Sequence, residues 1–343
     1  MDKKSRGRPR ISDEVKRDRR AAKLEQEVKD LRRKYKHAVV QMNKAEKEHE
    51  FASSIASSKD IFKITPYKSG GQSEATAVMV ASDWHVEEKV LSEEVNGLNE
   101  YDLAISRDRA TKYFQRGLRL VKVFNKDIKI NTLVVALLGD FFSGHLHDEL
   151  AEENFIAPAD AAILALEYLE SGIRFLLANS DLKLIIPCLP GNHGRMTQKN
   201  RTANESGNSL EYFMYVNLAE RFADEKRVQF IIPRSKHIYL EVYDMTIRFM
   251  HGHTVRYAGG VGGISIPLNK AIPQWDKLIA ADLTVLGHFH QFLDGGRWLV
   301  NGSMIGYNTF ALDNKFSYEE PKQAFFLVDK TRGKTVVAPI LLT

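Results

Sequence analysis

The sequence predicts an α/β protein in which apolar strands alternate with helices and polar residues follow each strand directly. Continuous apolar runs, such as residues 133–138, are typical of strands that are buried on both faces. The order β-α-β-α-β favours parallel strands joined by crossover helices. Ligands of open α/β sheets bind outside the carboxyl ends of the strands, so we expect a site there.

Bulk composition is that of a globular protein rather than a membrane protein. The 343 residues are 43% hydrophobic and 27% charged, which leaves room for one large domain with an appendage or for two modest domains. No apolar run approaches the roughly 20 residues that span a bilayer. The polar, basic N-terminus lacks the features of a secretory signal, and the single cysteine, Cys188, fits a reducing compartment. We therefore expect a cytoplasmic protein without a membrane partner.

The positive charge is concentrated at the start of the chain. Residues 1–50 hold 17 of the 49 basic and 10 of the 44 acidic residues, which leaves 32 basic and 34 acidic residues in the remainder. A basic arm on a near-neutral body favours a polyanionic partner, with DNA preferred. A solvated, solubilising tail is the alternative interpretation.

Residues 1–12 are expected to form a basic disordered arm. Gly7 and Pro9 oppose a helix there. The segment Arg-Gly-Arg-Pro resembles the core of an AT-hook, which is slim enough to lie in a narrow A·T-rich minor groove. The arginines that would contact DNA are Arg6, Arg8 and Arg10. A plain basic terminus fits the same residues.

Residues 13–51 are predicted to form a charged helix with a heptad seam. The seam has 4-3 spacing and consists of Leu24, Val28, Leu31, Tyr35, Ala38, Met42 and Ala45. This short coiled coil either forms a homodimer, which is favoured, or packs on the body. Residues 52–75 are rich in Ser, Lys and Gly and are interpreted as a linker, and residues 76–343 as one large domain.

The body is predicted element by element from hydrophobic periodicity. Its first half has strands at 77–81, 133–138 and 182–189, and helices at 106–124 and 159–177. Its second half has a helix at 207–223, strands at 228–232, 238–243 and 245–250, a helix at 268–280 interrupted at Pro273, and a strand at 283–286. The end of the chain is expected to be all-β, with strands at 297–300, 324–328 and 335–337.

Five strand ends carry candidate metal ligands. In chain order these are Asp83 and His85, Asp140, Asn192 and His193, His251, and His288 and His290. An isolated Asp after a strand is usually a turn residue or helix cap, but five successive strand ends indicate a metal site. If the last strand continues past Gly287, His288 and His290 point in the same direction.

These residues resemble the motifs of the calcineurin-like metallophosphoesterases. The matching segments are Asp83-Trp84-His85, Gly139-Asp140, Gly191-Asn192-His193, His251, Gly287-His288-Phe289-His290 and Asn301-Gly302-Ser303. The resemblance spans roughly residues 76–303 and implies a four-layer α/β/β/α sandwich of two mixed sheets. The chain also looks similar to phage- or prophage-encoded, nuclease-like members of the family.

The resemblance implies two divalent metal ions with Asp140 as the bridging ligand. One ion would be held by Asp83, His85, Asp140 and His290, and the other by Asp140, Asn192, His251 and His288. Mn is expected, and Fe, Zn or Ni also suit such donors. The paired ions would generate a hydroxide that attacks phosphorus, and His193 would protonate the leaving oxygen.

Two positions depart from the family pattern. Ser143 stands where the family often has Asp or Asn, and Gly194 stands where an acid usually orients the histidine. Another carboxylate could replace that acid. Arg195 and His253 are candidate substrate contacts, with ordinary polar loop residues as the alternative.

The sequence thus predicts a phosphodiesterase that acts on DNA. A phosphomonoesterase for proteins or small molecules is the second hypothesis, although the Gly-Asp-x-x-Asp-Arg element of protein phosphatases is absent. A non-catalytic DNA-binding protein is the third.

Overall fold

The computed structural model describes residues 13–56, 61–64, 73–144, 154–200, 203–256 and 263–343. The chain divides into two compact units, Met1–Ser57 and Ser58–Thr343. The first unit contains one long helix, α1 (Asp13–Ala56), which ends five residues beyond the predicted boundary at 51. Residues 1–12, with the predicted DNA contacts Arg6, Arg8 and Arg10, lie outside the described residues.

The first sheet of the second unit contains the parallel strands that the sequence predicted. Its order is β12 (Gly333–Leu341), β11 (Lys322–Asp329), β2 (Glu74–Ala81), β3 (Lys129–Leu137), β4 (Lys183–Pro187) and β5 (Val228–Ile231). Strands β2 to β5 are parallel, and β11 and β12 are antiparallel to their neighbours, which makes the sheet mixed. Every residue of β2 is buried, as expected for a strand that is covered on both faces.

The second sheet is also mixed. Its order is β1 (Ile61–Ile64), β6 (Ile238–Val242), β7 (Met245–Met250), β8 (Leu283–Leu286), β10 (Trp298–Val300) and β9 (Leu293–Asp294). Strand β1 was not predicted, because its four residues were assigned to a linker over 52–75. It pairs in parallel with β6, with Phe62 opposite Leu240, so this part of the expected linker is an edge strand.

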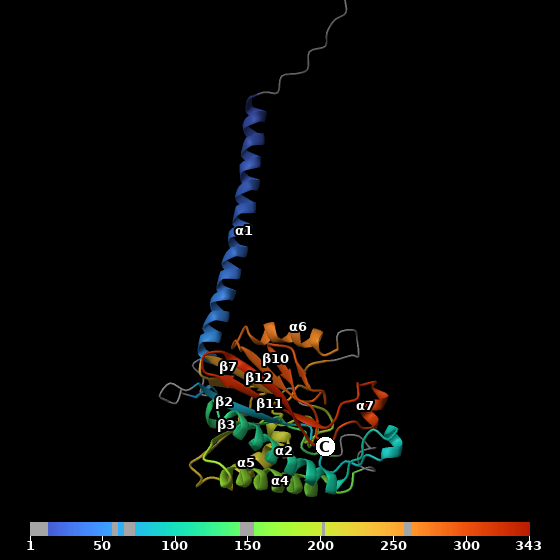
Figure 1. Cartoon of the computed structure of the whole chain (residues 1–343). Coiled ribbons are helices and arrows are strands. Elements are labelled where there is room, and N and C mark those ends of the chain that lie inside the picture. The colour runs from blue at the N-terminus through green and yellow to red at the C-terminus, as the bar shows by residue number, and fades with distance from the viewer. Residues whose placement is uncertain (1–12, 57–60, 65–72, 145–153, 201–202, 257–262) are drawn as a thin grey trace, which may run out of the picture. The chain divides into compact units, whose positions relative to one another are not determined.

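Helices cover the outer face of each sheet (Figure 1). Helices α2 (Leu103–Phe124), α4 (Pro158–Ala178) and α5 (Leu210–Glu220) pack on the first sheet, and α6 (Ser265–Trp275) packs on the second. The facing sides of the two sheets share a core that includes Val80, Val134 and Phe249. The predicted four-layer α/β/β/α sandwich is thus confirmed. Short helices lie at Ser92–Val95, Ser206–Asn208 and Thr309–Asp313 (α7).

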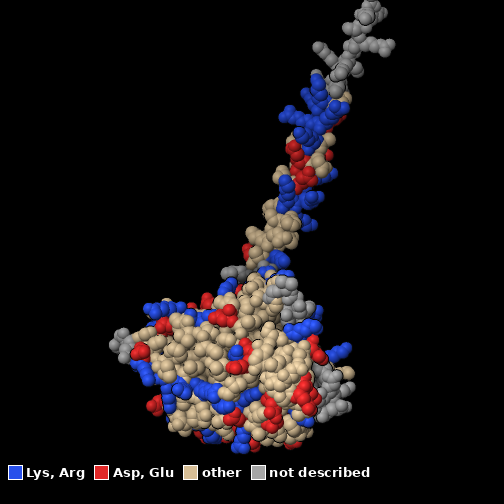
Figure 2. All heavy atoms as spheres, turned by 45° about the vertical axis from the view of Figure 1, so that its right-hand side comes forward, with Lys and Arg blue, Asp and Glu red and all other residues tan. Residues whose placement is uncertain are grey.

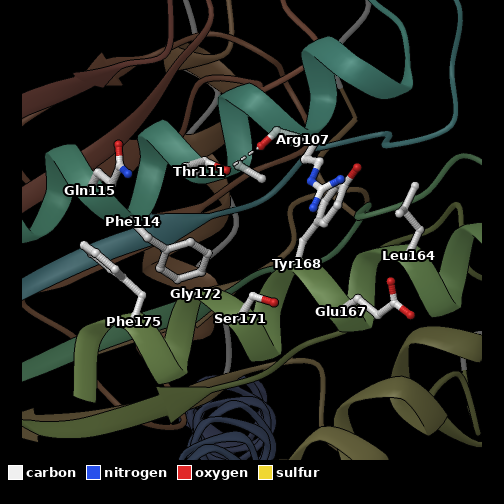
Figure 3. Close-up of a pocket in the computed structure, with 11 residues that line it drawn as sticks. Arg107, Thr111, Phe114, Gln115, Leu164, Glu167, Tyr168, Ser171, Gly172 and Phe175 are labelled. Atoms are coloured by element: carbon white, nitrogen blue, oxygen red, sulfur yellow. Dashed lines mark hydrogen bonds between the residues drawn. The ribbon is translucent and has the colours of Figure 1, made fainter. Parts of the chain in front are cut away.

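A hollow of about 320 Å³ lies along the seam between α2 and α4 (Figure 3). The ring of Phe114 occupies space over Gly172, where a Cβ would approach the ring to 2.0 Å. Arg107, Glu167 and Tyr168 line the same hollow. No strand-end residue lines it, so it is separate from the predicted site.

Among the described residues, none of the helices combines the length and the apolar character that a membrane span requires.

Candidate metal centre

Strand ends from both sheets meet at one place. The ends of β2, β3 and β4 supply the donors of the first sheet, and the ends of β7 and β8 supply those of the second. Glycines allow the loops to approach closely: a Cβ on Gly191 would lie 2.1 Å from Oδ1 of Asp140, and a Cβ on Gly287 would lie 2.4 Å from Oγ of Ser82. The motif glycines are therefore required by packing at the site.

Five of the predicted ligands have left-handed backbone conformations, which non-glycine residues rarely adopt. They are Asp83, His85, Asp140, His288 and His290, with φ between 48° and 71°. Such strain persists only where the surrounding structure imposes it, and it gathers at functional sites. The expectation that His288 and His290 follow strand alternation was wrong, because β8 ends at Leu286 and the chain turns sharply after it.

Asp83, His85 and His290 form a first donor group, whose ligand atoms all lie within 4.8 Å of one another. Nε2 of His85 lies 3.3 Å from Nε2 of His290, and Nε2 of His290 lies 3.5 Å from Oδ1 of Asp83. Asp83 and His85 are buried. A carboxylate and two imidazoles that converge in this way offer lone pairs to a common point.

Asp140, His251 and His288, together with Asn192, form a second donor group. Nε2 of His251 lies 2.9 Å from Oδ2 of Asp140 and 3.1 Å from Oδ1 of Asn192. Nδ1 of His251 donates to the carbonyl of Leu138 at 2.6 Å. Because a carbonyl only accepts, this bond directs Nε2 toward the other donors, as is usual for a metal-binding histidine.

Asp140 lies between the two groups. Its carboxylate belongs to a set with His251 and His288, and also to a set with His85 and His193. Burial would raise the pKa of this carboxyl, but His251 and the neighbouring imidazoles hold it well below its usual range. Asp140 is therefore an ionised carboxylate placed to serve both groups, in the position that a bridging ligand needs.

The buried imidazoles differ in the direction of their pKa shifts. Burial opposes charge on His85 and His251, but Glu88 raises the pKa of His85 to about 9, and Asp140 raises that of His251 to about 10. Burial and the charge of His251 lower the pKa of His288 to about 3. The carboxylates and imidazoles of the two groups suit a divalent cation, and binding of such an ion would compete with protonation of these imidazoles.

The first donor group is supported by a chain of side chains. Nδ1 of His85 lies 2.6 Å from Oγ of Ser143 and 3.2 Å from Oε1 of Glu88. Ser143 donates its hydroxyl hydrogen to Glu88, so its oxygen accepts from His85. Glu87 accepts from the backbone N–H of Ser143 at 2.7 Å. These contacts direct Nε2 of His85 toward His290.

Asp83 is tied to the end of the chain by a buried polar network. Oδ2 of Asp83 accepts from Oγ of Ser82 at 2.5 Å, and Ser82 in turn accepts from Nδ2 of Asn301 at 2.8 Å. Oε1 of Gln323 accepts from Asn301 at 3.1 Å and from Nε1 of Trp84 at 3.2 Å. Asn301 of the Asn301-Gly302-Ser303 segment therefore helps to position Asp83, through the hydroxyl of Ser82.

His193 is oriented by a backbone carbonyl rather than by an acid. Its Nδ1 donates to the carbonyl of Ser143 at 3.0 Å, which leaves Nε2 to carry any transferable proton. Its backbone N–H donates to Oδ1 of Asp140 at 2.8 Å, and its ring centre lies 4.8 Å from that of His85. Burial lowers the pKa of His193 against the attraction of Asp140.

Glu211 of α5 occupies the space that a side chain at position 194 would fill. A Cβ on Gly194 would lie 2.7 Å from Cγ of Glu211. Oε1 of Glu211 accepts from the backbone N–H of Phe141 at 2.7 Å, and Oε2 accepts from that of Gly191 at 2.6 Å. Burial raises the pKa of Glu211 to about 8, and this buried carboxyl group holds together the loops that carry Asp140 and Asn192.

The two weaker candidates lie beside the centre but have partners within the protein. The guanidinium of Arg195 donates to three carbonyls of its own loop, those of Asn192, Thr197 and Gln198. Nε2 of His253 lies 2.8 Å from Oε1 of Glu205, and its ring centre is 5.5 Å from that of His251. A role in substrate binding stays a prediction for both.

Four side chains that support the centre were not singled out from the sequence: Glu87, Glu88, Glu211 and Gln323. The first two lie in the loop that follows Asp83 and His85. Their one sequence signal is their position two and three residues after His85. Glu211 and Gln323 lie within a helix and a strand, where the sequence offers no cue to an inward carboxylate or amide.

No protein-family model matches the sequence, and no curated protein matches it. Among solved structures, a conserved Streptococcus pneumoniae protein described as a "predicted phosphoesterase" is 12% identical, covering 78% of this chain and 90% of that chain at a TM-score of 0.31. Vacuolar protein sorting 29 from Cryptosporidium parvum is 14% identical, covering 78% and 97%, at 0.31. A calcineurin-like phosphoesterase from Bacillus subtilis is 9% identical, covering 78% and 91%, at 0.28. At these values the likeness supports no functional inference, and function has to come from the side chains of the centre.

Proposed function

We propose that this protein is a metal-dependent phosphoesterase that hydrolyses phosphodiester bonds in DNA. The observation that carries the proposal is the pair of donor groups, with Asp140 of the second group also beside His85 of the first, at the meeting point of five strand ends. Two adjacent clusters of carboxylate and imidazole are the usual protein contribution to two-metal hydrolysis.

Each donor group would hold one divalent cation, and Mn is the expected ion. Bound there, two cations would supply positive charge to the phosphoryl oxygens and lower the pKa of a water. Within the chain, the bond from His251 to the carbonyl of Leu138 and the chain from His85 through Ser143 to Glu88 fix the donors. These contacts reduce the rearrangement that substrate binding would require.

His193 would hold the proton for the leaving oxygen. Its Nδ1 is engaged by the carbonyl of Ser143, so the proton to be transferred would sit on Nε2. Burial makes an imidazolium at this position a stronger acid than a free imidazolium, which favours proton donation once the ring is charged.

The charge distribution supports a polyanionic substrate. In α1, basic side chains gather in bands, whereas blue and red side chains are intermixed on the face of the second unit that Figure 2 shows. Residues 1–50 carry the excess of basic over acidic residues. A basic arm supplies affinity for phosphates that is independent of base sequence and sensitive to salt.

The reaction is tested with the full-length protein, Mn²⁺ and three substrates: linear double-stranded DNA, a small aryl phosphodiester and a small aryl phosphomonoester. We expect the diesters to be cleaved faster than the monoester, with DNA the best substrate. A preference for the monoester would replace the proposal by a phosphatase. Metal binding without turnover of any of the three would argue for a binding protein.

The arm is tested separately by replacing Arg6, Arg8 and Arg10 with alanine. We expect weaker DNA binding and a shallower salt dependence, with the slope falling by about 0.9 for each phosphate that the variant no longer neutralises. The matched control replaces three exposed basic residues of the second unit, Lys126, Lys226 and Arg332. Equal salt slopes for both variants would remove the arm from the proposal and leave the phosphoesterase intact.

A further inference from the structure

Helix α1 presents an apolar seam that no other described element of its unit covers. The large seam side chains are exposed by fractions that range from 46% at Val28 to 73% at Tyr35. Leu24, Leu31 and Met42 lie on the same seam and are exposed by 54%, 64% and 55%. Exposed apolar side chains at heptad spacing are typical of a helix that packs against another helix.

The heptad assignment follows from the 4-3 spacing. The a positions are Ala21, Val28, Tyr35 and Met42, and the d positions are Leu24, Leu31, Ala38 and Ala45. The larger side chains, Leu24 to Tyr35, lie together in the first half of the seam, where the contact would be strongest. The e and g positions beside them then decide which partner and orientation fit.

The charges beside the seam match a second copy of the same helix in parallel register. In a parallel coiled coil, a g residue faces the e residue five positions further along the other helix. Arg20 would thus face Glu25 of the second copy, and Glu27 would face Arg32 of the second copy. Both pairs have opposite charge, and two-fold symmetry doubles them. Figure 2 shows basic and acidic side chains in successive bands along α1.

We propose that α1 forms a parallel, in-register, two-stranded coiled coil with a second copy of this chain over about residues 20–45. The occupant of the seam is a second α1 because its charges complement the e and g residues of the first. This inference is independent of the proposed function, since it concerns assembly and not the metal centre.

The assembly is tested by sedimentation of the full-length protein over a range of concentrations. We expect a monomer–dimer equilibrium that Glu27→Arg weakens about tenfold, because the substituted side chain would face Arg32 of the other copy with the same charge. Adding Arg32→Glu to that variant restores opposite charges and should recover the dimer. A chain that is monomeric at every concentration, or a double variant as weak as the single one, would overturn the proposal.

Orientation and register are tested by cysteine pairing. Ala21 occupies an a position and Ala22 the neighbouring outward b position, so the two form a matched pair. We expect Ala21→Cys, but not Ala22→Cys, to give a disulfide-linked dimer under mild oxidation. In an antiparallel coil the two copies of residue 21 would lie about 36 Å apart, at 1.5 Å per residue. Equal crosslinking of the two variants, or none, contradicts the parallel arrangement.

Discussion

The two donor groups of the candidate centre are held in place by different means. In the first group, His85 depends on Ser143 and Glu88, and each link of that support is a side chain. In the second, His251 depends on the backbone carbonyl of Leu138. Glu211 adds a carboxylate there, but both of its partners are backbone N–H groups.

This difference teaches how the two groups should respond to change. Backbone support comes with the fold and cannot be removed by substituting the residue that supplies it. Side-chain support can be removed one group at a time. Substitutions should therefore separate the groups, whereas a change of pH should affect both, because the pKa values of His85 and His251 are both raised.

The largest effect is expected at Asp140, whose carboxylate lies between the two donor groups. Asp140→Ala should remove a donor from the second group and the carboxylate beside His85 of the first, and lower activity at least about 10³-fold, since metal ions supply several kcal/mol of charge stabilisation. Bound metal, measured by elemental analysis, should fall together with activity. The control is Asp224→Ala at an exposed position. Full activity without bound metal would remove this site from the mechanism.

Glu211→Ala should affect the second group, by about 10–100-fold in metal affinity. It leaves the N–H groups of Phe141 and Gly191 without an acceptor and frees the loops that they anchor. Titration calorimetry with Mn²⁺ measures the loss.

The space shared by positions 194 and 211 offers a reciprocal control. Gly194→Asp alone should destabilise the protein, because its Cβ would lie 2.7 Å from Cγ of Glu211. Combined with Glu211→Ala, the new carboxylate enters the vacated space and should recover part of the affinity. If the double variant loses as much metal affinity as the two single variants together, an acid at position 194 does not replace Glu211.

Glu88→Gln should weaken the first group and spare the second. The amide keeps a similar shape but loses the charge that raises the pKa of His85, and substitution of such a supporting group typically costs about 10-fold or more in metal affinity. Two-site calorimetry should show one affected site. Glu94→Gln, at an exposed position of the short helix Ser92–Val95 that follows, is the matched control. An equal loss of metal affinity at both sites would show that Glu88 does not support the first group alone.

Raising the pH from about 7 to about 10 should affect metal affinity and stability in opposite directions. The pKa values of about 9 for His85 and about 10 for His251 lie above the ordinary value of 6.5. Protonation of these two residues therefore stabilises the fold without metal, and this stabilisation is fully present below pH 6.5. This stabilisation is lost as the pH rises through the raised values. Metal affinity should rise over the same range, by up to about tenfold per pH unit for each displaced proton. Thermal unfolding with and without Mn²⁺ checks both trends.

Ser143→Ala should give the smallest change, a few-fold loss of affinity at the first group. The substitution removes the hydroxyl between His85 and Glu88 but leaves their direct contact at 3.2 Å. The carbonyl that orients His193 belongs to the backbone and is kept. The activity of the metal-saturated variant should therefore stay near that of the parent, and a large loss there would show that the hydroxyl acts beyond metal binding.

The fold and the donors could be predicted from the sequence where local pattern and spatial placement coincide. Buried strands are recognised as apolar runs, and parallel order brings their ends together, so the pattern alone predicted that Asp83, Asp140 and Asn192 lie near one another, whereas His251 was assigned to the same site through the family resemblance. Strand β1 was missed because its four residues are flanked by Ser, Lys and Gly, and its partner β6 lies more than 170 residues later.

The support of the donors could not be predicted, because it depends on contacts between distant segments. Glu211 reaches Phe141 across 70 residues, and Ser143 reaches His85 across 58. The left-handed backbone at His288 and His290 follows from the crowding of strand ends, whereas the sequence suggested continued alternation. Position 194 lacks the acid of the family pattern; Glu211 lies in that space, but the carbonyl of Ser143 orients His193 instead.

Strand β2, which delivers Asp83 and His85, pairs with β3 on one side and with β11 on the other. Its β11 neighbour is made more than 240 residues later, and Asn301 and Gln323 of that late segment bond to Ser82. A ribosome must therefore synthesise nearly the whole second unit before the first donor group can be locked. Folding is expected to be slow, since such distant pairing carries a large loop-closure cost. Premature termination before residue 322 should therefore yield a chain that lacks β11 and the bond from the backbone N–H of Ser82 to Gln323.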